Sequence, residues 1–187
     1  MSLIPAFEIG LWNAWILMVY NLILAFLIPL VVRGREKEAN FTVDLNKTEK
    51  NAILFMPIIY FILFLYSIFL PLRLGTTWFY IGLPISVLGA ILLTMATLNF
   101  ATSETGKPVS KGIYRYSRHP MYFGFFLIFI GIGLASASWL YLFFTLVLVF
   151  STYYVVTIEE RATIEKYGDA SREYMNRAPR WIGIPKS

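Results

Sequence analysis

The sequence has no cysteine among its 187 residues and only one histidine, His119. Without cysteine there is no disulfide, no thiolate nucleophile and no thiolate ligand for a metal. A lone histidine without a cluster of carboxylates is also a poor metal site, so we predict no resident metal ion. The sequence likewise lacks a glycine-rich dinucleotide fingerprint and a phosphate-binding loop, and no soluble nucleotide-binding domain is attached.

Charged residues are scarce as well. They make up 14% of the chain, whereas 58% of its residues are hydrophobic. Soluble domains carry about 25% charged residues, so the excess apolar surface requires a solvent other than water. We therefore predict an all-α integral membrane protein, with residues 1–187 forming a single membrane domain.

Long apolar stretches define the expected transmembrane helices, since a spanning helix needs roughly 20 apolar residues. Three such stretches precede residue 99, at Leu11–Val32, Ala52–Leu72 and Trp78–Leu98. The next one, Met121–Thr157, has about twice the length of one span. The small polar residues Ala135–Ser138 interrupt it and predict a tight turn, followed by a helix from about Trp139 to Thr157. We thus expect about five transmembrane helices, the last two forming a hairpin, although residues 121–135 are short and could dip into the membrane and return.

Lysine and arginine in short loops mark the cytoplasmic side of a membrane protein. Fifteen of the sixteen such residues lie in the 33–50 loop, the 99–119 loop or the tail after residue 157, and Arg73 is the exception. This asymmetry predicts an outside N-terminus and a cytoplasmic C-terminus. It also explains the net charge of +5 through contact with anionic lipid headgroups, so we expect membrane lipids and no nucleic acid as partners.

The 99–119 loop holds part of the stretch GIYRYSRHPMYFG, residues 112–124. Pro120 suits the first position of a helix, and the free amides of a helix start can bind a carboxylate or a phosphate. His119 could act as a general base or could simply hydrogen-bond the helix end. Tyr114, Tyr116 and Tyr122 could be interfacial aromatics or could supply flat faces for a planar ligand.

The tail after residue 157 carries the adjacent carboxylates Glu159 and Glu160. Helical spacing continues to Tyr167, where Gly168 offers a stop, and we expect Asp169 or Ser171 to cap a second short helix that ends before Pro179. An amphipathic tail on the headgroups would explain the arginines but not the two carboxylates. Adjacent helical residues point about 100° apart, so one glutamate can face inward while the other meets water. The working hypothesis is one polar site, formed by the 99–119 loop and this tail.

These residues carry a family resemblance. The pattern Gly112-x-Tyr114-x-x-x-Arg118-His119-Pro120-x-Tyr122-x-Gly124, a helical hairpin, Glu159-Glu160 and the ending YGDASREYMNRAPR resemble the isoprenylcysteine carboxyl methyltransferases. The resemblance covers roughly residues 99 to 181, after the three N-terminal spans of residues 1–98. The wider superfamily includes phospholipid and small-thiol methyltransferases.

The resemblance implies S-adenosylmethionine as the methyl donor, released as S-adenosylhomocysteine and bound at the cytoplasmic face without a Rossmann domain. It places cofactor contacts at Asn99, Lys107, Pro108, Val109, Tyr114, His119, Pro120, Met121, Tyr122, Glu159 and Glu160. The cofactor carboxylate would meet the helix start at Pro120, its adenine the tyrosines, and its ammonium or ribose hydroxyls Glu159. No catalytic residue is assigned, because an ionised acceptor held in line needs no strong base. An amine acceptor would need one, with His119 or Glu160 as candidates.

The expected reaction is methylation of a lipophilic or prenylated acceptor that comes from the bilayer. The eukaryotic prenylcysteine enzymes carry an arginine about one helical turn before the glutamates, thought to hold the substrate carboxylate, and this chain has Val155 there. A phospholipid amine or a small thiol is therefore the alternative acceptor. Other classes are a membrane reductase, which usually has more spans, and a basic membrane scaffold, which leaves the glutamates unexplained. The glycines Gly131 and Gly133 are expected to pack helices within the hairpin or across a dimer, so the oligomeric state stays open.

Overall fold

The computed structural model describes residues 7–31 and 43–186, and these residues form helices joined by loops. In chain order the elements are α1 (Trp15–Val31), α2 (Lys47–Ile68), α3 (Thr77–Ala101), the 3-10 helix η2 (Gly112–Arg115), α4 (Pro120–Ala135), α5 (Trp139–Tyr167) and α6 (Asp169–Arg177). The all-α prediction is confirmed. Of the described helices, α2, α3 and α5 are long and apolar enough to cross a membrane, while α4 and the start of α1 are shorter apolar helices.

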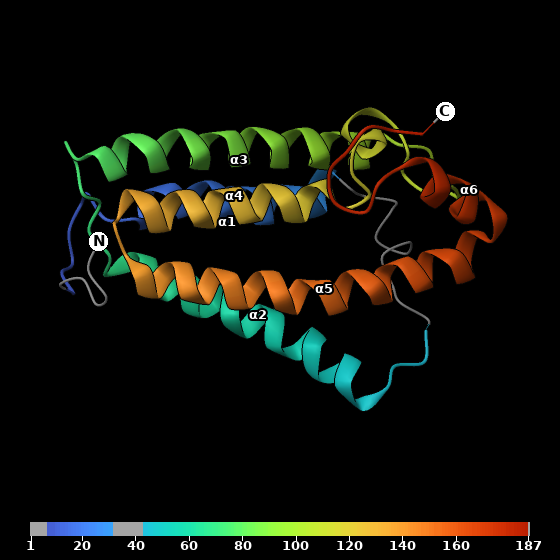
Figure 1. Cartoon of the computed structure of the whole chain (residues 1–187), viewed down its shortest axis with the longest axis horizontal. Coiled ribbons are helices and arrows are strands. Elements are labelled where there is room, and N and C mark those ends of the chain that lie inside the picture. The colour runs from blue at the N-terminus through green and yellow to red at the C-terminus, as the bar shows by residue number, and fades with distance from the viewer. Residues whose placement is uncertain (1–6, 32–42, 187) are drawn as a thin grey trace.

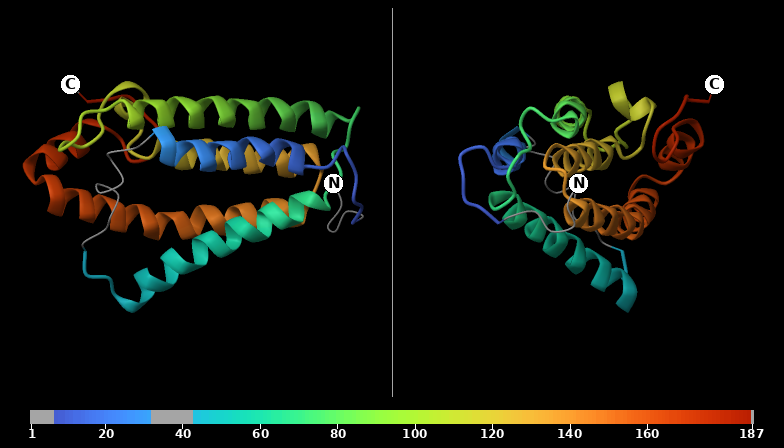
Figure 2. Two further views of the ribbon diagram at one scale, coloured as in Figure 1. Left: turned by 180° about the vertical axis from the view of Figure 1, so that it is seen from behind. Right: turned by 60° about the vertical axis from the view of Figure 1, so that its left-hand side comes forward.

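Helices α1 to α5 run along the long axis of the molecule and alternate in direction (Figure 1). The connections α2–α3 and α4–α5 lie at one end, whereas η2, α6 and the C-terminus gather at the other (Figure 1; seen from behind in Figure 2). The 99–119 loop and the tail after residue 157 therefore meet at one end, as expected. The basic residues Arg33, Arg35 and Lys37, which also entered the topology prediction, lie outside the described residues.

The α4–α5 hairpin follows the sequence prediction closely. Helix α4 ends at Ala135, and α5 begins at Trp139 after its N-cap Ser138, whose hydroxyl accepts the amide of Tyr141 at 3.2 Å. With 16 residues, α4 is about 24 Å long, shorter than the roughly 30 Å of hydrocarbon in a bilayer. With 29 residues, α5 is about 43 Å long, so its last turns continue past the apolar stretch that ends at Thr157. Those turns carry Glu159 and Glu160 out of the apolar layer.

Four glycines bring α3 and α4 into close contact. Gly82 and Gly89 on α3 are seven residues apart, as are Gly124 and Gly131 on α4, so each pair shares one helix face. A methyl group added at Gly131 would lie 2.4 Å from the backbone nitrogen of Ser86 and 2.6 Å from the carbonyl oxygen of Gly82. Backbone thus meets backbone along this interface, and no larger residue fits without moving a helix.

Gly133 packs differently from Gly131, although both are buried in α4. A methyl group at Gly133 would meet the side chain of Leu142 on α5, at 2.5 Å, rather than a neighbouring backbone. Gly133 therefore packs within the hairpin, as predicted, whereas Gly131 packs against α3, which the prediction did not include.

Some helix boundaries differ from the sequence prediction. Helix α2 begins at Lys47 rather than Ala52, because Asn46 and Glu49 form a reciprocal capping box with two hydrogen bonds of 2.9 Å. Helix α1 begins at Trp15 rather than Leu11. Before it, the Asn13 carboxamide donates to the carbonyl of Ile68 at 2.8 Å and so ties the preceding segment to the end of α2.

The expected cap of α6 is wrong. Helix α5 continues to Tyr167 and ends at Gly168, whose φ of 56° is the predicted glycine stop. The same glycine precedes the first residue of α6, Asp169, and no side chain caps this helix. The Ser171 hydroxyl instead donates to the carbonyl of Thr163 on α5 at 2.8 Å. Because the chain turns tightly at Gly168, Ser171 lies close to α5, and its hydroxyl bonds that helix instead of capping α6.

Candidate functional site

The stretch 112–122 is held in place by the end of α3. Gly112 has a φ of +58°, and a Cβ at this position would lie 1.7 Å from the Asn99 carboxamide oxygen, so only glycine fits. That oxygen accepts the amide of Ile113 at 2.8 Å. The chain then passes through η2 and enters α4, where Pro120 occupies the first helical position as predicted.

A cavity of about 470 Å³ lies between this stretch, the start of α4, the end of α5 and α6. Such a volume falls within the roughly 300–1,000 Å³ of small-molecule and cofactor sites. Ten of the eleven residues expected to contact a cofactor line it: Lys107, Pro108, Val109, Tyr114, His119, Pro120, Met121, Tyr122, Glu159 and Glu160. The structure places Asn99 outside the lining, where its carboxamide holds the loop before η2.

The cavity has further lining residues that the sequence reasoning missed: Phe100, Arg118, Phe125, Ala162, Thr163, Lys166, Tyr167, Tyr174 and Met175. Thr163 and Lys166 follow Glu159 by four and seven residues, which is the spacing of one helix face. Extending the helical period of α5 beyond the glutamates would have found them. Tyr174 and Met175 belong to α6, and their placement depends on the reversal at Gly168.

Glu160 is the more buried of the two glutamates, with 10% of its side chain exposed. Its Oε1 lies 2.8 Å from Arg118 Nη2, 3.2 Å from Arg180 Nε and 3.2 Å from His119 Nε2, and its Oε2 accepts from Arg180 Nη2. Burial by itself would raise the pKa of Glu160, but the His119 hydrogen bond and the two guanidinium groups outweigh it and lower the pKa to about 2. The side chain is therefore an ion-paired carboxylate at neutral pH.

Glu159 has fewer partners and borders the cavity with 27% of its side chain exposed. Its Oε1 accepts the Tyr122 hydroxyl at 2.5 Å, and its Oε2 lies 3.4 Å from His119 Nδ1. A carboxylate offers about four acceptor positions, so Glu159 retains capacity for a ligand. The expectation that the two glutamates differ holds in this form: one is enclosed by cations and the other is open to the cavity.

His119 bridges the two glutamates through both ring nitrogens. Burial would lower the pKa of His119, but hydrogen bonds and charge from Glu159 and Glu160 outweigh it and raise the pKa above 6.5. The ring makes no cap for α4. It links α5 to the start of α4 through these two contacts.

Comparison with known protein families shows to which family the chain belongs. Residues 72–170 match the sequence model of the phospholipid methyltransferases, a span that covers more than half of the chain and includes residues 112–124 and both glutamates. The chain belongs to the phospholipid methyltransferase family. This family stands within the same group of integral membrane methyltransferases as the isoprenylcysteine carboxyl methyltransferases. Searches of curated proteins and of solved structures gave no significant match.

Membership of the phospholipid methyltransferase family confirms that the chain is a membrane methyltransferase, and therefore an enzyme. The residues present also fit the methyl donor S-adenosylmethionine. The cavity offers a carboxylate with free acceptor positions at Glu159, the first amides of α4 near Met121, and aromatic side chains such as Tyr114. These groups suit an ammonium or hydroxyl, a carboxylate and a purine ring, respectively.

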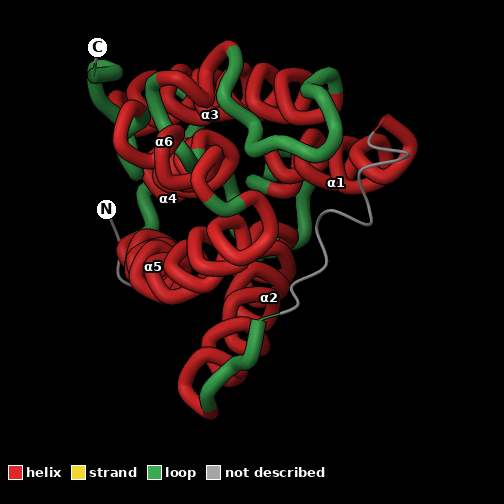
Figure 3. Tube along the Cα trace, turned by 90° about the vertical axis from the view of Figure 1, so that its right-hand side faces the viewer, coloured by secondary structure: helices red, strands yellow, loops and turns green. Residues whose placement is uncertain are grey.

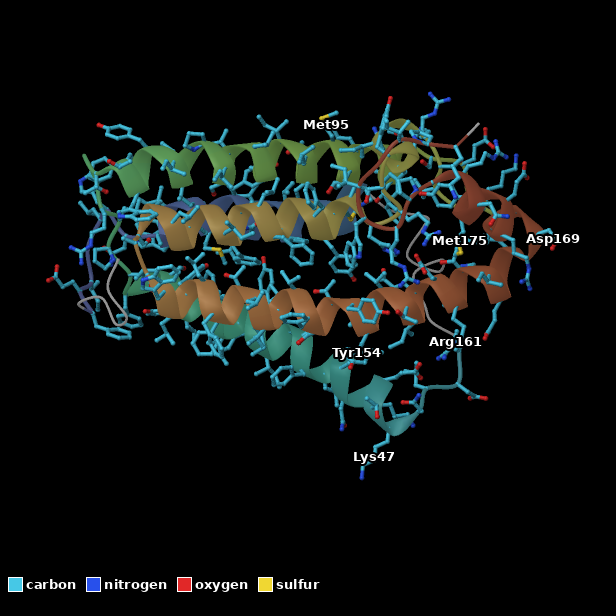
Figure 4. The ribbon with its side chains drawn as sticks, in the orientation of Figure 1. Lys47, Met95, Tyr154, Arg161, Asp169 and Met175 are labelled. Atoms are coloured by element: carbon cyan, nitrogen blue, oxygen red, sulfur yellow. The ribbon has the colours of Figure 1, made fainter. Side chains whose placement is uncertain are left out.

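Helix α6 closes one side of the cavity in this member of the phospholipid methyltransferase family. Looking along the bundle from the site, Figure 3 shows α6 beside the start of α4 and above α5. Tyr174 on α6 donates from its hydroxyl to the carbonyl of Tyr114 at 2.8 Å, and the Arg118 guanidinium donates to the carbonyl of Met175 at 2.9 Å. Figure 4 shows Met175 on the side of α6 that faces α5. Helix α6 thereby contributes Tyr174 and Met175 to the cavity wall.

Proposed function

We propose that this chain is an S-adenosylmethionine-dependent methyltransferase whose acceptor is a lipophilic molecule drawn from the bilayer. The observation that carries the proposal is the position of Glu159. It faces a cofactor-sized cavity with acceptor capacity to spare, at the end of the apolar bundle where α4 begins. A water-soluble donor and a membrane-embedded acceptor can both reach such a place.

In this proposal each end of the donor has a partner in the chain. Glu159 binds the ammonium or the ribose hydroxyls, the first amides of α4 bind the carboxylate, and Tyr114 and Tyr122 flank the adenine. S-adenosylmethionine supplies a methyl group attached to a positively charged sulfur, from which a nucleophile can displace it. Residues 1–187 act as one membrane domain, with the cavity on the cytoplasmic side as the positive-inside pattern suggests.

Positioning is the main catalytic contribution of the chain. Holding two reactants in line and away from water can supply about 7–11 kcal/mol. His119 is a poor general base, because both of its nitrogens face carboxylates that favour the protonated ring. Glu160, with a pKa of about 2, is an equally poor base at neutral pH. No catalytic base is therefore assigned to either residue, and an amine acceptor would have to lose its proton to water before it reacts as the neutral amine.

We propose a phospholipid amine as the acceptor, ahead of a prenylcysteine carboxylate. A carboxylate acceptor needs a cationic partner, but the buried Val155 stands where the prenylcysteine enzymes have arginine. Arg118 in the cavity wall and Arg180 beside it are both bound to Glu160. The other lysine or arginine residues of the lining are Lys107 and Lys166. The matched family is that of phospholipid methyltransferases, which favours the amine acceptor. The motif resemblance at residues 112–124 is what supports the prenylcysteine alternative.

The acceptor is tested with purified protein in lipid nanodiscs and methyl-labelled S-adenosylmethionine. We expect label in the lipid fraction when phosphatidylethanolamine is present and only background in phosphatidylcholine nanodiscs, because the amine is the nucleophile. A prenylcysteine analogue is added in a parallel reaction. If prenylcysteine methyl ester were labelled and phospholipid were not, the acceptor would be the prenylcysteine carboxylate and not the phospholipid amine.

A further inference from the structure

Most of the hydrogen-bonding capacity of the Glu160 carboxylate is used by partners within the protein. Its two oxygens receive four contacts, three on Oε1 and one on Oε2, from Arg118, His119 and Arg180. A carboxylate offers about four acceptor positions in all. The Oε1 atom of Glu160 is therefore fully occupied, and only one acceptor position on Oε2, beside Arg180, is left in the cavity wall.

The three partners come from two segments that are distant in the sequence. Arg118 and His119 precede α4, whereas Arg180 follows α6, and Glu160 lies on α5 between them. One buried carboxylate thus joins α5, the start of α4 and the C-terminal tail. Removing its charge would leave the Arg118 and Arg180 guanidinium groups close together without their shared carboxylate, which is a costly arrangement for charges with little access to water.

Backbone hydrogen bonds form around this ion cluster and connect the same segments. The Arg118 amide donates to the carbonyl of Pro179 at 2.9 Å, and the Gly183 amide donates to the carbonyl of Tyr116 at 3.0 Å. The Trp181 ring lies 6.3 Å from the His119 ring. The tail therefore lies along residues 116–119. The contacts of Glu160 with Arg118 and Arg180 join the same two segments.

We infer that Glu160 is a positioning residue that holds the C-terminal tail, residues 178–186, and α6 against the start of α4 and so completes the wall of the cavity. It acts through Arg118 and Arg180 and does not touch the ligand. The inference rests on the proposed function only for the identity of that ligand, S-adenosylmethionine. The attachment of the tail is a property of the chain alone.

The test is hydrogen exchange of Glu160→Gln, measured without ligand in nanodiscs. The neutral amide of glutamine cannot pair with two guanidinium groups, so we expect the amides of Arg118 and Gly183 to exchange at least tenfold faster than in the wild-type protein. The control is Glu173→Gln, which removes the partner of Arg177 on α6 from a side chain that is 68% exposed. Its tail amides should exchange at the wild-type rate.

Binding of S-adenosylmethionine to the same variants separates this inference from the proposed function. We expect Glu160→Gln to bind at least tenfold more weakly, together with the faster exchange. Weaker binding with unchanged tail exchange would overturn the inference and make Glu160 a direct ligand. If the wild-type protein bound no S-adenosylmethionine while the tail of Glu160→Gln still exchanged faster, the positioning role would stand and the proposed cofactor would be wrong.

Arg180 provides a second variant that leaves Glu160 and its contact with Arg118 in place, in case Glu160→Gln does not fold. We expect Arg180→Gln to accelerate exchange at Gly183, and Arg180→Lys, which retains the charge, to accelerate it less. Equal exchange in Arg180→Gln and the wild-type protein would overturn the positioning role of the cluster.

Discussion

Replacing Glu159 with glutamine is expected to weaken the binding of S-adenosylmethionine roughly 10- to 100-fold, since a hydrogen bond to a charged group contributes about 1.5–3 kcal/mol. Glu159 is the carboxylate that faces the cavity with free acceptor positions, because Tyr122 and His119 occupy only part of its capacity. Isothermal titration calorimetry in nanodiscs measures the change. Tail exchange should stay near the wild-type rate, in contrast to Glu160→Gln.

The matched control for this prediction is Glu165→Gln. Glu165 lies on the same helix, is exposed to solvent, and is not part of the cavity wall. Its replacement should leave the dissociation constant unchanged. An unchanged dissociation constant in Glu159→Gln as well would show that Glu159 does not bind the cofactor.

Replacing Gly131 with alanine is expected to lower the stability of the bundle by about 1–3 kcal/mol, the usual cost of overpacking. The added methyl group would meet the backbone of α3 at Ser86 and Gly82, so two helices must separate. Thermal unfolding of the detergent-solubilised protein should show a midpoint several degrees below that of the wild-type protein. Because α3 and α4 both lead into the cavity, cofactor binding should weaken as well.

Gly133→Ala is the control, two residues further along α4. Its methyl group would overlap the Leu142 side chain, which can change rotamer, and would touch the Tyr141 ring at an ordinary 3.4 Å. We therefore expect a smaller decrease in the unfolding midpoint. Equal midpoints for Gly131→Ala and Gly133→Ala would contradict the close backbone packing of α3 on α4.

The helices and the turn Ala135–Ser138 were predictable because hydrophobic runs and helix-breaking residues are local features of the sequence. Helix α2 begins earlier than predicted because the capping box of Asn46 and Glu49 adds a polar first turn, which a search for apolar residues does not detect. The cap of α6 was mispredicted for a related reason. Ser171 is a good capping residue in isolation, but the fold uses its hydroxyl to bind Thr163 on α5.

The predicted site residues come together because the two ends of the α4–α5 hairpin meet at one end of the bundle. Sequence could not show which of the two glutamates remains open to a ligand. That difference depends on Arg180, twenty residues after Glu160, and on the tail folding back over residues 116–119. Asn99 was assigned through a family pattern, whereas the structure gives it the Ile113 amide as a partner.

The most direct test of the central claim is calorimetric titration of the wild-type protein with S-adenosylmethionine, S-adenosylhomocysteine and NADPH. We predict saturable binding of the first two ligands, with about one site per chain, and no binding of NADPH. Binding of NADPH without binding of S-adenosylmethionine or S-adenosylhomocysteine would contradict the account.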